Sequence, residues 1–197
     1  MLDTRARRGF DKYFDITARL FLSWGLQPNH VTVIALIIGL GAGLTLYFGC
    51  YIPAVLLLWL SGFLDAVDGS MARQSGTSSP SGALYDIFCD RIVELSIFWA
   101  LALRQPESLY AMLGLVSAVL LRMTVFLTTG MLAQKSGAKS FYYQAGLMER
   151  TEGFIASTCM ILFSQWLVPI TWTYAALITI TIVQRLVEAR KLLKNNT

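Results

Sequence analysis

The chain is poor in charged residues and in histidine. These shortages limit the class of protein and the kinds of metal site that it can form. Only 14% of its 197 residues are charged, whereas soluble domains carry about a quarter. A very apolar soluble domain is disfavoured because the apolar residues form runs long enough to cross a bilayer. The single histidine, His30, is not expected to bind metal, and the three cysteines show no spacing typical of ligands.

Other absences bear on processing, on the number of domains and on the type of catalysis. The first residues are polar and charged, without an early apolar region that ends at a small-residue cleavage site, so we expect no cleavable signal peptide. We find no internal repeat or low-complexity tract, which favours one domain over residues 1–197. No serine or cysteine nucleophile with a base partner is evident, so a covalent enzyme intermediate is not expected.

What is present is mostly long apolar segments, which predict an all-α integral membrane protein with six transmembrane helices. Five of the segments are clear, and a sixth is split by charges. Turn residues separate them: Asn29 is the expected N-cap of the first helix, and Pro53 falls in the first turn of the second. The expected helices cover residues 31–48, 53–73, 82–103, 109–132, 153–168 and 172–192.

The segment before the first expected span is amphipathic. Aromatic residues such as Phe14 and Trp24 recur at helical spacing, while charged residues such as Lys12 fill the other face. This pattern is typical of a helix that lies in the membrane interface, and equally of a surface helix packed on the bundle. We therefore expect an N-terminal amphipathic interfacial helix within about residues 1–27 and a six-helix bundle within about 28–192.

The distribution of lysine and arginine predicts the orientation. These residues gather at both termini and in the loop between the fourth and fifth expected spans, which all fall on one side if six helices alternate. The opposite side carries only Arg104. By the positive-inside rule, both termini face the cytoplasm. We expect a protein of the plasma (inner) membrane, with the connection at 74–81 on its cytoplasmic side.

Four aspartates interrupt the apolar sequence at helical spacing: Asp65 and Asp68 in one expected span, and Asp86 and Asp90 in the next. Each carboxylate costs about 2.5–3.5 kcal/mol at the centre of a membrane helix. The short connection makes the two helices antiparallel neighbours, so their acidic faces can meet. Converging carboxylates repel one another, and a bound divalent cation is the simplest compensation. The pattern therefore predicts a metal site.

The residues beside the aspartates favour a phosphate ligand. Gly69 and Ala72 are small where a ligand would approach the backbone, and Arg73 offers a guanidinium fork for phosphate oxygens. Oxygen ligands, a small groove and an arginine suit Mg²⁺ or Mn²⁺ holding a diphosphate. Attack on a phosphoryl group also needs a proton acceptor, and Asp90, which lies one turn deeper in its helix than Asp86, is suited to that task.

The complete pattern resembles the signature of the CDP-alcohol phosphotransferase (CDP-alcohol phosphatidyltransferase) family at all eight positions. These positions are Asp65, Asp68, Gly69, Ala72, Arg73, Gly82, Asp86 and Asp90. The resemblance covers most of the chain. It implies an integral membrane enzyme, usually a homodimer, that uses Mg²⁺ or Mn²⁺ at two sites to displace CMP from a CDP-linked alcohol with a second alcohol. We expect no nucleic-acid partner.

The same resemblance implies the role of each signature residue. Asp65, Asp68 and Asp86 would ligate metal, and Asp90 would act as the general base and contact a second metal. Small residues, an arginine and a Pro-Asn-x-x-Thr element would hold the CDP moiety. These CDP-binding residues are Gly69, Ala72, Arg73, Gly82, Pro28, Asn29 and Thr32.

We expect a phospholipid-synthesis transferase with CDP-diacylglycerol or a related CDP-lipid as donor and a polar alcohol as acceptor. The sequence Asp90-Arg91-x-x-Glu94 resembles members that use inositol or inositol phosphate. Glycerol, glycerol phosphate, serine and ethanolamine stay open, as does a CDP-headgroup donor with diacylglycerol as acceptor. A divalent-cation transporter is the alternative from another class, although no inverted repeat supports it. A non-catalytic lipid-binding scaffold is a third.

An acceptor pocket is expected beyond Asp90. Its candidate residues are Glu94, Arg122, Lys135 and Arg150. Arg122 would either bind an acceptor phosphate or balance nearby carboxylates inside the bundle. Parts of the family carry a Glu-Arg-x-Glu-Arg element near Arg150, and this chain has Gly153 in place of its second arginine.

Overall fold

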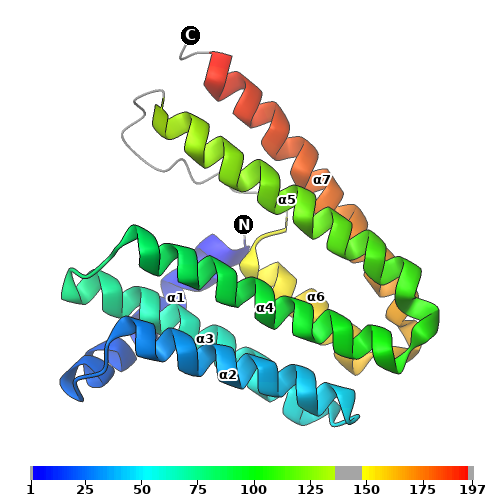
Figure 1. Cartoon of the computed structure of the whole chain (residues 1–197), viewed down its shortest axis with the longest axis horizontal. Helices are drawn as coiled ribbons and strands as arrows, with labels where there is room; N and C mark the ends of the chain where they lie inside the picture. Colours follow the sequence, from blue (N-terminus) through cyan, green and yellow to red (C-terminus); the bar gives the residue numbers. More distant parts are fainter. Residues whose placement is uncertain (1, 136–147, 195–197) are drawn as a thin grey trace.

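The computed structural model describes residues 2–135 and 148–194, and every regular element in these ranges is a helix (Figure 1). Seven are α-helices: α1 (Leu2–Ser23), α2 (Pro28–Tyr47), α3 (Tyr51–Ser75), α4 (Pro80–Arg104), α5 (Leu109–Lys135), α6 (Arg150–Leu162) and α7 (Leu167–Lys194). Two short 3₁₀ turns, η1 (Pro106–Ser108) and η2 (Ser164–Trp166), precede α5 and α7. Each of the six expected bundle segments corresponds to one helix.

The ends of two helices differ from the sequence prediction. Asn29 is not an N-cap, because α2 already begins at Pro28. The start of α2 is capped instead by Gln27 and His30. The backbone N–H of His30 donates to the Gln27 carbonyl, and the backbone N–H of Gln27 donates to Nδ1 of His30. Helix α6 ends at Leu162, six residues before the expected end, because the chain departs from helical geometry at Phe163.

Helices α2, α3 and α4 form one tightly packed layer (Figure 1). Glycines on α2 permit this close approach. A Cβ at Gly39 would lie 2.4 Å from the Val93 side chain, and one at Gly43 would lie 2.7 Å from Oγ of Ser96. Ser61 of α3 ties the layer further by donating to the backbone carbonyl of Ala35 at 2.8 Å. Small residues of this kind are typical of helix contacts inside membranes, and here they fix both α3 and α4 against α2.

Helices α5 and α7 form an antiparallel pair that leans away from this layer (Figure 1). The ring of Trp172 covers Gly114, where a Cβ would lie 2.8 Å from the indole. Helix α6 contacts both α3 and α7 and so connects the layer to the pair. A shared core of buried apolar residues, including Ile97, Leu115 and Ile178, joins the two parts.

Helix α1 packs on α3 and α6. The rings of Phe14 and Phe63 meet with centroids 5.4 Å apart, and Ser70 donates to the carboxylate of Asp15 at 2.5 Å. Other apolar side chains of α1 stay exposed, among them Tyr13 and Leu20. The helix is therefore a surface helix of the bundle that still presents an apolar edge outward.

Four helical segments are long and apolar enough to cross a membrane: those at 28–47, 51–75, 106–132 and 164–191. The other two bundle helices miss the criterion for different reasons. Helix α4 has 25 residues but carries the charges of the candidate site. Helix α6 has only 13 residues, whereas a full crossing takes about 20. Many large apolar side chains point outward on the bundle, as expected for contact with lipid.

Candidate active site

The predicted acidic faces of α3 and α4 meet. Asp65 and Asp68 of α3 and Asp86 of α4 each place one carboxylate oxygen within 4.8 Å of the others. Asp65 and Asp68 are 7% and 5% exposed, so their carboxylates are largely withdrawn from water. The packing of α2 between these helices holds the cluster in place, because it fixes how closely α3 and α4 approach.

Two oxygens in this cluster fit a bound cation. Oδ2 of Asp68 and Oδ1 of Asp86 are buried and have no hydrogen-bond partner among the residues that the structure describes. A buried carboxylate oxygen without a partner is costly. Three convergent carboxylates with free oxygens are the donor set that Mg²⁺ and Mn²⁺ prefer. The residues present therefore fit a divalent metal.

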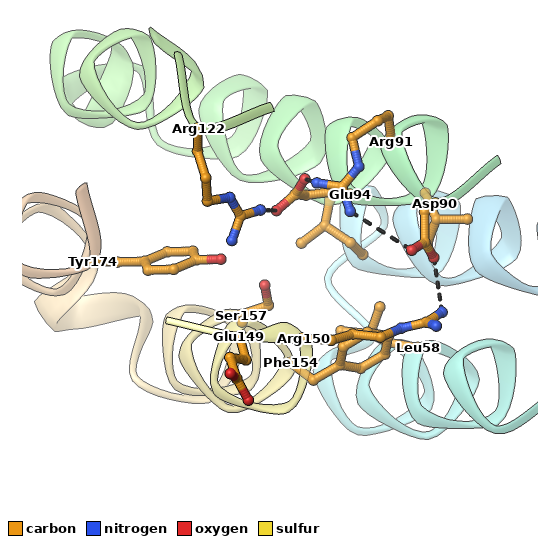
Figure 2. Close-up of a pocket in the computed structure, with 13 residues that line it drawn as sticks. Leu58, Asp90, Arg91, Glu94, Arg122, Glu149, Arg150, Phe154, Ser157 and Tyr174 are labelled. Carbon is orange, nitrogen blue, oxygen red and sulfur yellow. Dashed lines mark hydrogen bonds and ion pairs between the residues drawn. The ribbon is translucent and has the colours of Figure 1, made fainter. Parts of the chain in front are cut away.

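Asp90 lies one turn further along α4 and is paired with arginines. Nη2 of Arg150 donates to Oδ1 of Asp90 at 3.0 Å, and Nη2 of Arg91 lies 3.7 Å from Oδ2 (Figure 2). Arg150 also donates to Asp65. It therefore links the metal-binding candidates to Asp90, which is outside the group of three convergent carboxylates. Asp90 is held by cations on both oxygens.

A cavity of about 490 Å³ opens beside the cluster. It lies between the start of α2, the end of α3 and the start of α4. Asp68 and Asp86 form part of its wall, so a ligand bound there would contact the carboxylates directly. All seven residues predicted to bind CDP also line it: Pro28, Asn29, Thr32, Gly69, Ala72, Arg73 and Gly82.

Local sequence shapes the mouth of this cavity. Gly76, at φ +68°, ends α3 in the left-handed conformation that favours glycine. Ser79 caps α4 by accepting a hydrogen bond from the backbone N–H of Gly82 at 3.1 Å. A Cβ at Gly82 would lie 3.2 Å from Oγ of Ser79 and would crowd this cap. The exposed guanidinium of Arg73 stands at the same rim.

A second and smaller cavity, of about 50 Å³, lies on the other side of Asp90. Helices α3, α4, α5, α6 and α7 all contribute to its lining, α3 through Leu58 (Figure 2). Glu94 accepts from Arg91 and lies 3.9 Å from Nη2 of Arg122. Asp90 borders this cavity, while Asp68 and Asp86 border the larger one. The aspartates therefore lie between the two cavities.

Comparison with known proteins identifies the family. A sequence model of the CDP-alcohol phosphatidyltransferase family matches residues 26–187. The chain belongs to this family. It is accordingly a transferase of substituted phosphate groups.

Relatives cover nearly the whole chain. A phosphatidylinositol phosphate synthase of Corynebacterium glutamicum is 30% identical over 97% of this chain and 90% of its own. An archaetidylinositol phosphate synthase of Pyrococcus horikoshii is 31% identical over 87% of this chain and 88% of its own.

Crystal structures of a related protein have the same fold. The phosphatidylinositol phosphate synthase of Mycobacterium tuberculosis, in complex with manganese and citrate, is 26% identical, with a TM-score of 0.70 over 90% of this chain and 88% of its own. The same protein with CDP-DAG bound is 25% identical, with a TM-score of 0.66 over 90% of this chain and 94% of its own.

Within this CDP-alcohol phosphatidyltransferase, three of the four predicted acceptor residues come together. Glu94, Arg122 and Arg150 line the smaller cavity. Of the two roles considered for Arg122, the structure has it beside the carboxylate of Glu94. Lys135 ends α5, and its side chain lies outside the part of the chain that the structure describes.

Sequence reasoning missed several residues of both cavities. In the larger one these are Gln27, Thr77, Ser78, Ser79 and Ala83, most of them turn residues next to the predicted motifs. In the smaller one Tyr174 and Ser157 were not foreseen, because other hydroxyl side chains such as Thr158 and Thr173 lie beside them in the sequence and no motif distinguishes them. A polar side chain within a span is the only signal that would have indicated them.

Proposed function

We propose that the chain transfers a phosphatidyl-type group from a CDP-linked lipid, foremost CDP-diacylglycerol, to a polar alcohol and releases CMP. One observation carries the proposal: the predicted CDP-binding residues and two of the clustered aspartates line a single cavity. CDP-DAG is bound in the crystal structure of the M. tuberculosis relative, which supports the same donor here. The exposed rim beside Arg73 would admit the polar cytidine diphosphate, while the lipid tails remain in the membrane.

Asp65, Asp68 and Asp86 would hold a divalent cation, Mg²⁺ or Mn²⁺. The partnerless oxygens of Asp68 and Asp86 support this, as does the manganese in the M. tuberculosis relative. The cation would neutralise charge on the diphosphate and stabilise the leaving phosphate. Asp90 lies one turn away and would contribute to a second metal site.

Asp90 is our candidate for the general base. It borders the smaller cavity, where an alcohol would approach the β-phosphorus on the side opposite the nucleotide. The alcohol oxygen forms a bond to that phosphorus, the bond to the bridging oxygen breaks, and CMP leaves with the electron pair. Asp90 accepts the hydroxyl proton. Arg91 and Arg150 would orient its carboxylate for this transfer.

We also propose a membrane arrangement. All six bundle helices would cross the plasma membrane, including α4 and the short α6, with both termini and the donor cavity at the cytoplasmic face. The half-buried carboxylates of α4 support its crossing, because Asp86, Asp90 and Glu94 face α3, α6 and α5 respectively rather than lipid. The apolar edge of α1 would lie in the interface. Residues 1–197 would form one domain that assembles as a homodimer.

The test is a direct assay of the purified protein in detergent micelles. CDP-diacylglycerol is supplied with Mg²⁺ or Mn²⁺ and a panel of alcohols, and the lipid product is identified by mass. We expect metal-dependent CMP release and a product that contains one acceptor. CMP release without any divalent metal would contradict the proposal. So would the absence of CMP release when CDP-diacylglycerol is bound. Turnover with diacylglycerol and a CDP-headgroup would point to the reverse donor arrangement.

A further inference from the structure

The smaller cavity contains a hydroxyl that the mechanism above does not use. Tyr174 is 2% exposed, and its Oη has no hydrogen-bond partner among the residues that the structure describes. The ring reaches from α7 into the cavity, so that the hydroxyl points toward the Arg122 and Glu94 side chains (Figure 2). Buried tyrosine hydroxyls normally find a partner. A ligand that occupies the cavity would supply it.

Helix α6 keeps the space around this hydroxyl open. A Cβ at Gly153 would lie 3.0 Å from Oη of Tyr174, so any larger residue would crowd the hydroxyl. Ser157, one turn later on the same face, adds a second hydroxyl to the wall of the cavity. The cavity therefore presents neutral hydrogen-bonding groups on the side that faces α4.

The charges of the cavity are already paired with one another. Arg91 contacts Glu94 and Asp90, Arg122 contacts Glu94, and Arg150 contacts Asp90. Its described lining contains three arginines and three acidic residues, so it is formally neutral. A phosphate would have to displace a carboxylate from one of these arginines, at a cost in desolvation and lost pairing.

An alcohol hydroxyl requires no such exchange. It can donate to the carboxylate of Glu94 and accept from Tyr174 while the ion pairs persist. The pairing of charges in the described lining therefore selects against a phosphorylated acceptor.

We propose that this cavity is the acceptor subsite and that it selects an uncharged polyhydroxy alcohol. Tyr174 and Glu94 bind acceptor hydroxyls, and Gly153 determines specificity by keeping Oη of Tyr174 accessible. This inference rests on the proposed transferase function. It separates the chain from the relatives whose names specify phosphatidylinositol phosphate or archaetidylinositol phosphate as the product.

The first experiment compares matched acceptors. Metal-dependent CMP release from CDP-diacylglycerol is measured with glycerol against glycerol 3-phosphate, and with inositol against inositol 1-phosphate. In whichever pair gives the faster turnover, we expect kcat/KM for the uncharged alcohol to be at least about tenfold higher than for its phosphorylated counterpart. A preference for the phosphorylated member in the pair with the faster turnover would overturn the inference. No turnover with any alcohol, or failure to bind CDP-diacylglycerol, would instead overturn the proposed function.

The second experiment removes the hydroxyl alone. For Tyr174→Phe we expect the acceptor KM to rise about five- to tenfold, because one neutral hydrogen bond is lost. The KM for CDP-diacylglycerol should stay unchanged, and the Tm should not fall, because no described protein group loses a partner. Tyr110→Phe is the matched control, since Tyr110 is 80% exposed on α5. An unchanged acceptor KM with a lower Tm would assign Tyr174 a structural role and overturn its part in binding.

A third variant tests the space beside the hydroxyl. Gly153→Ala places a methyl group against Oη of Tyr174, so we expect a higher acceptor KM with an unchanged donor KM. In Gly153→Ala/Tyr174→Phe the second substitution should add little, because both act on the same contact. Fully additive effects would contradict the proposed role of Gly153.

Discussion

The guanidinium of Arg150 donates to the carboxylate of Asp90 at 3.0 Å, although the two residues lie 60 positions apart in the chain. The same guanidinium bonds Asp65, on a third helix. Arg150 begins α6, so this short helix is positioned to hold the metal-binding candidates and the candidate base in one arrangement. An arginine that orients ligating carboxylates affects catalysis without contacting the substrate.

Replacing Arg150 therefore tests this link. For Arg150→Ala we expect kcat to fall about 10- to 100-fold, together with weaker binding of Mn²⁺, because the carboxylates lose their orienting partner. Metal-dependent CMP release and Mn²⁺ titration measure the two effects. Arg190→Ala, at an exposed position late in α7, is the matched control. Unchanged metal affinity and unchanged kcat would contradict an orienting role.

Asp90→Asn tests the candidate base while preserving its shape. We expect kcat to fall about 10²- to 10⁴-fold, because an amide cannot accept the hydroxyl proton. Binding of CDP-diacylglycerol should persist, since Asp90 borders the acceptor cavity and not the donor cavity. Asp11→Asn, at an exposed position on α1, provides the control. Full turnover by the Asp90 variant would favour a non-catalytic role for this aspartate.

Arg73→Ala tests the rim of the donor cavity. Because a charge-assisted hydrogen bond to phosphate contributes about 1.5–3 kcal/mol, we expect the KM for CDP-diacylglycerol to rise about 10- to 100-fold. The acceptor KM should change little, since Arg73 lies on the far side of the aspartates from the smaller cavity. Substrate-dependence curves for both substrates separate these effects. A change confined to the acceptor would refute the assignment.

Gly39→Ala tests the packing that holds α3 and α4 together. The new Cβ would lie 2.4 Å from Val93 and 2.8 Å from Oγ of Ser61, so the layer has to open. We expect destabilisation of about 1–3 kcal/mol, measured as a lower Tm in detergent. Gly41→Ala is the control, because its Cβ meets only Leu57, at 3.8 Å. Equal Tm values for the two variants would show that the close contact is unimportant.

Much of the donor site could be predicted because it depends on local spacing. Asp65 and Asp68 share one helical face, Asp86 follows on an antiparallel neighbour, and a short connection brings them together. The site residues at the start of α2, Pro28, Asn29 and Thr32, could be predicted in the same way. The N-cap, however, was assigned to Asn29, whereas the helix already begins at Pro28. In this region, sequence neighbours are also spatial neighbours.

The acceptor side could not be predicted in the same way because its residues come from five helices. The pairing of Arg150 with Asp65 spans 85 positions, and the approach of Tyr174 to Gly153 depends on how α7 packs against α6. The early end of α6 at Leu162 was also missed, because its apolar run continues through Phe163 while the backbone does not. Tertiary packing decides each of these features, and periodicity does not report it.

The central claim is that Asp65, Asp68 and Asp86 coordinate a divalent cation that in turn binds the diphosphate of the donor. Its most direct test is a Mn²⁺ titration of CMP release, run in parallel on the native protein and on Asp68→Asn. We predict saturable activation of the native protein and almost complete loss of metal-dependent turnover in the variant, with its helical content and Tm preserved. Activation of the variant at the same Mn²⁺ concentration, to the same rate, would contradict the account.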